Sequence, residues 1–230
     1  PVAARHRRES LDLDALPALL PHLAVHGVLG QLTRVAAAAD PAEIARVRSG
    51  FPEGSFVLGV FVRLVKLDAN NLSVLARMLA AYPRFHLVIA GPGDPAMAEA
   101  FARRPDLAGR VTLHAGLVDL DVYGPAIDLM CDTFPFIGGN ACRQVSAHGT
   151  PVLARLGTPW DPLLQSDRNP DLLARSDEEY IALAIRVAED AEFREEQRRV
   201  AVEKALAYAD PTPMLEDVEA AIARSRGGAT

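Results

Sequence analysis

The chain has 230 residues, half of them hydrophobic, and a formal net charge of −6 at pH 7. This length can build one well-packed core with a small appendage, but not two full domains. Acidic and basic residues are interspersed and no run of about 18 apolar residues occurs, so the sequence predicts neither a nucleic-acid-binding surface nor a transmembrane segment.

In chain order, the first predicted element is a helical lead-in over residues 1–50, which are rich in Ala and Leu. The chain starts at Pro1 without Met or the apolar core of a signal peptide, which indicates a processed protein or, as we prefer, a piece of a longer one. The lead-in is therefore also interpreted as a possible remnant of an interdomain region or of an N-terminal domain.

From residue 51 onward, short apolar runs alternate with segments of helical periodicity. Strands are expected at 55–61, 86–90, 111–114, 128–131, 152–154 and, at one edge, 171–174; helices are expected at 71–82, 95–103, 122–126 and 141–148. Two more helical segments follow at 176–209 and 213–224, and the first opens with Ser176 and Glu179 at the spacing of a capping box.

This alternation predicts an α/β fold: a Rossmann-like parallel sheet with helices on both faces, formed by residues 51–210. Residues 211–230 are interpreted as a C-terminal helix and tail. Ligands of such sheets bind at the carboxyl ends of the strands. We therefore expect a site among the loops that follow the predicted strands.

The loop after the first strand carries two cations, Arg63 and Lys66. Side chains three positions apart share one face if they lie on a helical turn, and there they can clamp a diphosphate and offset the charge of a leaving nucleotide. Solvated surface charge is the alternative interpretation.

The loop after the fourth strand contains paired glycines, Gly138 and Gly139, directly before a predicted helix. A helix start offers free backbone N–H groups and the positive end of the helix dipole, which favour phosphate. The loop lacks the dinucleotide-binding and P-loop signatures, so these motifs indicate neither dinucleotide binding nor ATP hydrolysis here. A tight structural turn is the alternative.

Residues that commonly bind metals form no recognisable site. Cys131 and Cys142 have neither zinc-ligand nor disulfide spacing, and His86 and His114 fall within predicted strands. We expect no metal, and two reduced thiols in a cytoplasmic protein.

Together these segments resemble the C-terminal, donor-binding domain of GT-B glycosyltransferases, in particular the O-linked N-acetylglucosamine transferase family and its bacterial protein-glycosylating relatives. The resemblance covers about residues 55–209. Its most specific parts are the run DTFPFIGG at 132–139, the sequence GTPV at 149–152, and the segment 61–68 around Lys66.

The resemblance implies a role for each site residue. Lys66, with Arg63 beside it, contacts the donor diphosphate and stabilises the departing UDP, while Leu117 and Val118 hold the nucleobase. The helix start (Gly138, Gly139, Asn140 and Ala141) binds the phosphates, and Gln144 binds the ribose. The family usually has threonines where this chain has Asn140-Ala141-Cys142, and an acid where it has Gln144, so hydroxyl contacts are lost and the ribose bond is weakened.

The implied activity is metal-independent transfer of a sugar from UDP-sugar, the co-substrate, to a protein Ser, Thr or Asn or to a sugar, with inversion and without a cofactor. The acceptor and the base belong mainly to an N-terminal GT-B domain, for which residues 1–50 are too few. This chain alone is expected to bind donor and transfer little. Two alternatives stay open: a retaining GT-B transferase that acts on a small sugar or lipid, and a non-catalytic scaffold that binds a sugar nucleotide. The retaining group has a glutamate ahead of its glycine-proline pair, and residues 144–150 contain no acid.

Overall fold

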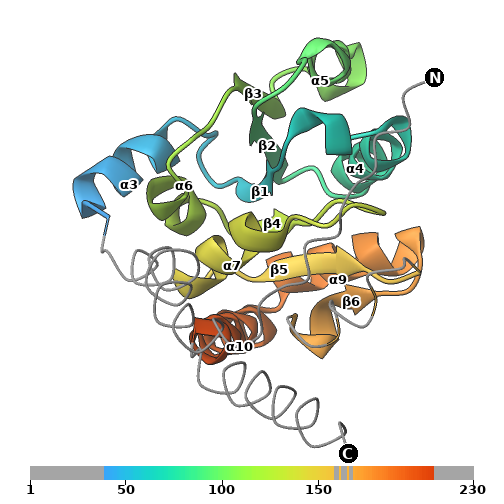
Figure 1. Ribbon diagram of the computed structural model, residues 1–230. Helices are drawn as coiled ribbons and strands as arrows, with labels where there is room; N and C mark the ends of the chain where they lie inside the picture. Colours follow the sequence, from blue (N-terminus) through green and yellow to red (C-terminus); the bar gives the residue numbers. More distant parts are fainter. Residues whose placement is uncertain (1–38, 158–160, 162–164, 166–167, 210–230) are drawn as a thin grey trace, which may run out of the picture. The chain divides into compact units, whose positions relative to one another are not determined.

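The computed structural model describes residues 39–157, 161, 165 and 168–209. Their centre is a six-stranded parallel sheet in the order β3-β2-β1-β4-β5-β6 (Figure 1). The strands are β1 (Phe56–Phe61), β2 (Phe85–Gly91), β3 (Val111–Ala115), β4 (Leu129–Cys131), β5 (Val152–Arg155) and β6 (Leu173–Ala174). The predicted Rossmann-like fold is confirmed.

Helices follow the strands as the sequence pattern predicts, with boundaries shifted by a few residues. They are α3 (Pro41–Ser49), α4 (Ala69–Ala81), α5 (Ala96–Ala102), α6 (Leu120–Ala126), α7 (Gly139–Ala147), α9 (Asp177–Glu189) and α10 (Ala191–Ala209). Short 3-10 turns lie at Leu64–Lys66, Pro105–Leu107 and Pro170–Leu172. The helices expected within 1–38 and at 213–224 lie outside the described residues.

The expected helical stretch 176–209 is divided in two at Asp190, which has extended backbone. The Asp190 carboxylate accepts the N–H of Phe193 at 2.9 Å and so caps α10. At the start of α9, Ser176 accepts the N–H of Glu179 at 3.1 Å, as the capping box predicts. Glu179 in turn accepts the N–H of Arg175 rather than that of Ser176.

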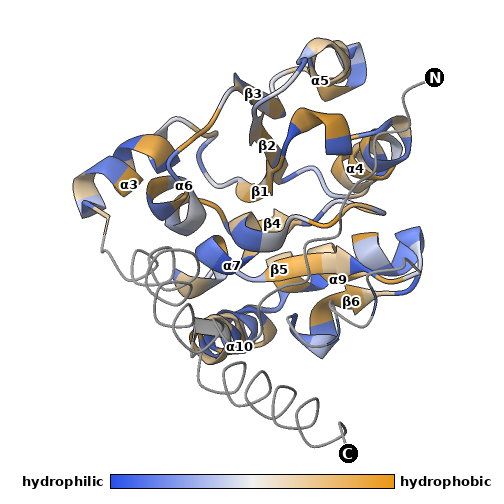
Figure 2. Ribbon diagram, viewed as in Figure 1, coloured by the Kyte–Doolittle hydropathy of each residue, from blue (hydrophilic) through white to orange (hydrophobic). Residues whose placement is uncertain are grey.

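Two apolar cores cover the two faces of the sheet, because successive side chains of a strand point to opposite faces. Phe56, Leu58 and Val60 of β1 pack with residues of α4, α5 and α9. Val57 and Phe61 pack instead with residues of α3, α6 and α7. The buried strand β5 is among the most hydrophobic segments, whereas α3 and α10 mix hydrophilic and hydrophobic residues (Figure 2).

The first strand contains one glycine, Gly59. A Cβ at this position would lie 2.4 Å from the Cδ1 of Ile127, so a larger residue would require the end of that side chain to shift. The two cysteines belong to these cores: Cys131 and Cys142 are both free and buried. Burial raises the pKa of the Cys131 thiol to about 12 and that of Cys142 still further, so both stay protonated at neutral pH.

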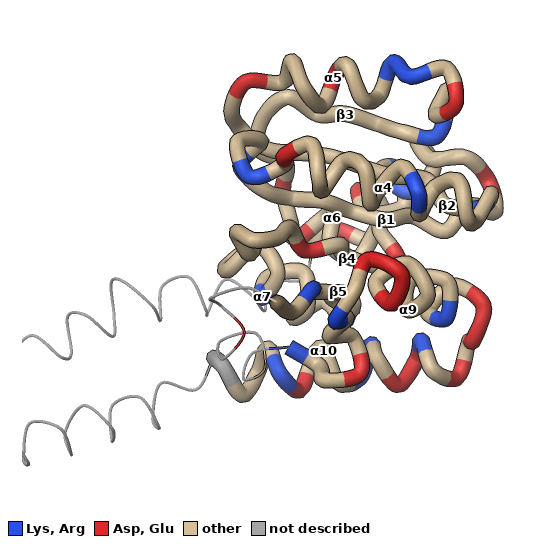
Figure 3. The backbone as a smooth tube through the Cα atoms, turned by 90° about the vertical axis from the view of Figure 1, so that its right-hand side faces the viewer, with Lys and Arg blue, Asp and Glu red and all other residues tan. Residues whose placement is uncertain are grey.

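Charged residues of both signs are interspersed on the surface, as along α10 (Figure 3). Arg199 of that helix pairs with Glu196 at 2.5 Å, one turn away. Among the described residues, no helix is long and apolar enough to cross a membrane.

The strand order reverses next to β1. The chain leaves β1 towards β2 and β3 on one side and later returns on its other side as β4. The loops that follow β1 and β4 therefore diverge from neighbouring strand ends. In open parallel sheets, such a switch point leaves the crevice in which ligands bind.

Candidate functional site

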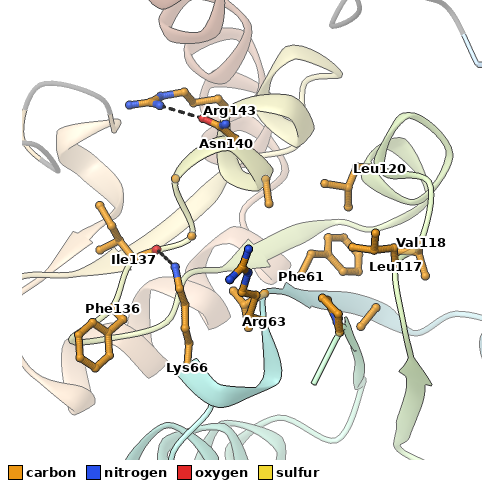
Figure 4. A pocket seen from close by; sticks show the side chains of 17 residues that line it. Phe61, Arg63, Lys66, Leu117, Val118, Leu120, Phe136, Ile137, Asn140 and Arg143 are labelled. Atoms are coloured by element: carbon orange, nitrogen blue, oxygen red, sulfur yellow. Dashed lines mark hydrogen bonds between the residues drawn. The ribbon is translucent and has the colours of Figure 1, made fainter. Parts of the chain in front are cut away.

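A cavity of about 660 Å³ lies at this switch point. The loops after β1, β2, β3 and β4 and the first turns of α6 and α7 form its walls (Figure 4). Its lining includes Arg63, Lys66, Leu117, Val118, Gly138, Gly139, Asn140 and Ala141, which are all the residues predicted for the site except Gln144.

Lys66 connects two walls of the cavity. It ends the 3-10 turn after β1, which is anchored by the buried side chains of Leu64 and Leu67. Its Nζ donates a hydrogen bond of 2.7 Å to the carbonyl oxygen of Ile137, in the loop after β4. Arg63 precedes the turn, is exposed, and points into the cavity beside Lys66 (Figure 4). The predicted pair of cations therefore faces one space.

The two glycines before α7 have different surroundings. A Cβ at Gly138 would lie 2.9 Å from the Oδ1 of Asp132 and 3.1 Å from the Sγ of Cys142, whereas a Cβ at Gly139 would meet nothing within 4 Å. Gly138 is therefore required by packing, and Gly139 leaves the backbone open to the cavity. Since α7 begins at Gly139 rather than at Ala141, Asn140 and Ala141 lie in its first turn, where N–H groups have no acceptor within the helix.

Buried hydrogen bonds hold the loop between β4 and α7. The Oδ1 of Asp132 accepts the N–H of Thr133 at 2.9 Å and that of Gly138 at 2.5 Å. The Nδ2 of Asn71, in α4, donates to the carbonyl of Phe134 at 2.6 Å. Burial raises the pKa of the Asp132 carboxyl, and the nearby Arg168 guanidinium opposes this shift. The shape of the loop is thus set from within the protein.

Gln144 does not line the cavity. Its Nε2 donates to the Oδ1 of Asp121 in α6 at 2.9 Å, and the Nε2 of His148 lies 2.9 Å from the same oxygen. The reason is the helical period, which turns Gln144 toward α6, while Arg143 lies on the cavity side. The structure therefore places the residue predicted for the ribose in a contact between α6 and α7.

Several lining residues were not among the predicted site residues. They are Phe61, Leu120, Phe136, Ile137 and Arg143, together with Val62, Ala90, Gly91 and Pro92. Phe136 is 57% exposed at the rim. Arg143 follows Asn140 by three positions and donates to its Oδ1 at 3.3 Å. That spacing is a helical signal and was available in the sequence, whereas the apolar residues carry no signal that separates a lining from a core position.

A six-stranded parallel sheet with a cationic, glycine-lined cavity at its switch point is an arrangement typical of α/β domains that bind nucleotides. No protein-family model and no curated protein matches the chain. Solved structures do match it, and they identify the class more closely.

One is the O-GlcNAc transferase of Thermobaculum terrenum, with 25% identity and a TM-score of 0.63 over 76% of this chain and 38% of that one. HepE of Anabaena, in complex with UDP and glucose, matches with 18% identity and a TM-score of 0.62 over 80% of this chain and 53% of that one. The C-terminal domain of the group 1 glycosyltransferase LpcC from Francisella tularensis matches with 14% identity and a TM-score of 0.58 over 76% of this chain and 96% of that domain.

The structural neighbours are thus GT-B glycosyltransferases, O-GlcNAc transferase among them. The chain spans 38% and 53% of the first two, but almost all of an isolated C-terminal domain is matched. It therefore has the architecture of the C-terminal, donor-binding half of a GT-B glycosyltransferase, which confirms the resemblance seen in the sequence.

Proposed function

We propose that the chain is the sugar-nucleotide-binding domain of a metal-independent glycosyltransferase. In this proposal the complete enzyme transfers a sugar from a UDP-sugar to a protein Ser, Thr or Asn side chain or to another sugar, with inversion and without a bound cofactor. The observation that supports it most is the position of Lys66 and Arg63, which face the start of α7 across one cavity at the switch point of the sheet.

The cavity suggests how the donor lies. Leu117 and Val118 are at one end, the two cations are in the middle, and Phe136 and Ile137 are at the other end (Figure 4). We place the nucleobase at Leu117 and Val118 and the diphosphate between the cations and the first turn of α7. The sugar is attached to the β-phosphate and therefore extends toward Phe136.

The proposed chemistry is a displacement at C1 of the sugar. The acceptor oxygen or nitrogen forms a bond to C1, the bond from C1 to the phosphate oxygen breaks, and UDP leaves with the electron pair. Charge grows on the β-phosphate as this happens, so the Lys66 ammonium and the helix dipole stabilise the transition state more than the bound donor. The acceptor's proton passes to a base on a partner domain.

That partner is proposed to be an N-terminal GT-B domain, which also brings the acceptor. The incomplete coverage of the neighbouring enzymes supports it. Loops at the carboxyl edge of the sheet also carry three exposed apolar side chains that such a partner would cover, namely Val65 at 85%, Leu117 at 87% and Phe136 at 57% exposure.

The direct test is calorimetric titration of the chain with UDP, comparing wild type with Lys66→Ala. Loss of a charge-assisted contact is expected to raise the Kd by about tenfold or more. Arg84→Ala is the matched control, because Arg84 is an exposed cation that precedes β2, at the opposite edge of the sheet, and its guanidinium donates to the carbonyl of Gly54. Equal affinities of wild type and Lys66→Ala would contradict the proposal.

A non-catalytic sugar-nucleotide-binding domain is the second candidate, and the engagement of Gln144 with Asp121 favours it because the ribose then loses a partner. UDP binding without sugar transfer by the full-length protein would support this candidate. If transfer occurs, the anomeric configuration of the product separates inversion from the retaining alternative.

A further inference from the structure

A series of buried polar side chains leads from α10 to the loop between β4 and α7, which contains Gly138. Gln197 of α10 is 1% exposed and accepts a hydrogen bond from the Nδ2 of Asn169. The preceding residue, Arg168, is 4% exposed, and its guanidinium lies 3.4 Å from the Oδ2 of Asp132. The other carboxylate oxygen of Asp132 accepts the N–H of Gly138. Two consecutive residues thus connect α10 to the residue that precedes α7.

Stability gives a poor account of this arrangement. Removing two charges from water costs much of what their attraction returns, and apolar residues that replace a buried ion pair are often neutral or stabilising. Polar groups that bond to one another in a low-dielectric interior instead favour one arrangement of the groups that they join. Here the group at its end is Gly138, whose Cβ position is only 2.9 Å from Asp132.

The network also ends next to the cavity. Gly138 lines the cavity and is followed directly by α7, whose first turn forms one wall. Neither Asp132 nor Arg168, Asn169 or Gln197 is a lining residue of this cavity. A change in their arrangement therefore reaches a ligand only through the position of the loop.

We propose that this network lets α10 set the position of the loop between β4 and α7. Gln197 and Asn169 orient Arg168, and Arg168 orients the Asp132 carboxylate. Asp132 in turn holds Gly138 and the start of α7 at the cavity. These four side chains are positioning residues. The inference rests on the proposed function, because it gives the position of the loop a role in binding the donor diphosphate.

The first test changes the end of the network farthest from the cavity. Gln197→Leu removes the contact with Asn169, and Arg194→Ala is the control on the same helix, because Arg194 donates to the carbonyls of Val187 and Ala188 at the end of α9. Two quantities are measured by NMR and calorimetry: hydrogen exchange of the Gly138 amide, relative to that of Leu58 in β1, and the Kd for UDP.

Gln197→Leu is expected to accelerate exchange at Gly138 relative to Leu58, and to raise the Kd for UDP, each by about two- to thirtyfold. Arg194→Ala is expected to change neither the relative exchange rate of Gly138 nor the Kd for UDP. If Gln197→Leu changes both quantities no more than Arg194→Ala does, the inference is overturned. If the wild-type chain binds no UDP, the proposed function fails, while the exchange at Gly138 still decides whether the network positions the loop.

The second test separates positioning from a purely structural role. Asp132→Asn and Arg168→Met each leave an uncompensated buried group, so both single variants are expected to lose stability, and the double variant to regain much of it. A neutral amide at position 132 accepts the Gly138 N–H less strongly than a carboxylate does. The double variant is therefore expected to keep the weakened UDP affinity and fast Gly138 exchange. Wild-type values of both in the double variant would refute the inference.

Discussion

The ammonium group of Lys66 donates a hydrogen bond of 2.7 Å to the carbonyl oxygen of Ile137, and this bond joins the loop after β1 to the loop after β4. Lys66 therefore makes a structural contact within the protein. We expect Lys66→Ala to lower the free energy of unfolding by about 0.5–1.5 kcal/mol, the usual net value of one hydrogen bond. Urea denaturation measures this change. A loss several times larger would mean that weaker UDP binding by this variant reports damage to the fold.

The neighbouring glycines Gly138 and Gly139 allow a matched comparison. Gly138→Ala brings a methyl group to 2.9 Å from Asp132 and 3.1 Å from Cys142, so we expect a loss of about 1–3 kcal/mol in stability. Gly139→Ala meets no atom within 4 Å and is at the start of a helix, so its stability should be unchanged or slightly higher. Its methyl group projects into open space beside the backbone, where we place the phosphates.

Thermal unfolding and UDP titration together test this pair. We expect different results for the two variants. Gly138→Ala should unfold at a lower temperature than wild type, whereas Gly139→Ala should keep its stability and lose affinity for UDP. A Gly139→Ala variant with wild-type affinity would show that the diphosphate does not approach the backbone there.

The sequence could predict those parts of the site that lie directly after a strand. The apolar run before Arg63 and the run before Asp132 are both recognisable as buried strands, and parallel strands end at the same edge. That reasoning brings Lys66 and Gly138 into one crevice without any structure. The helix after Gly138 was also predictable, because a glycine pair precedes a helical pattern, although it begins two residues earlier than expected.

The side-chain partners were not predictable in the same way. Gln144 turns to Asp121 because α7 packs against α6, and that packing joins segments more than twenty residues apart. The contact of Arg168 with Asp132 joins residues that are 36 positions apart. In contrast, the division between α9 and α10 had a local cause, since Asp190 caps the N–H of Phe193. The sequence has no Gly or Pro at that point, and the helical periodicity continues through it. One continuous helical stretch was therefore predicted although Asp190 is a residue type that caps helices.

His86 gives a prediction about pH. It is 5% exposed, its Nε2 lies 2.9 Å from the Thr112 hydroxyl, and burial, together with the charge of Arg110, lowers its pKa from the ordinary value of 6.5. In the unfolded chain this histidine takes up a proton as the pH falls through its ordinary pKa, whereas in the folded chain it does so only at lower pH. Stability should therefore fall as the pH is lowered below that value.

The measurement is urea denaturation at about pH 7.5 and about pH 5.5 for wild type and His86→Asn. The contribution of this one group is at most about 1.4 kcal/mol per pH unit. His86→Asn is expected to show a smaller loss of stability between the two pH values than wild type. Equal losses in the two proteins would assign the pH dependence to other groups.

Phe136 provides the sharpest test of how the donor lies in the cavity. This residue is 57% exposed at the end of the cavity away from Leu117, and it precedes Ile137, whose carbonyl oxygen accepts the hydrogen bond from Lys66. A sugar that extends from the diphosphate toward this end lies against the ring, while UDP alone does not reach it.

We expect Phe136→Ala to weaken the binding of UDP-glucose or UDP-N-acetylglucosamine by about three- to tenfold, the range of an aromatic contact. The affinity for UDP should stay unchanged, and Phe136→Tyr, which keeps the ring, should bind all three ligands as wild type does. Because the side chain is exposed, the stability of these variants should be close to that of wild type. An equal loss for UDP and for the UDP-sugars would instead place the nucleotide, rather than the sugar, beside Phe136 and reverse the proposed direction of the donor.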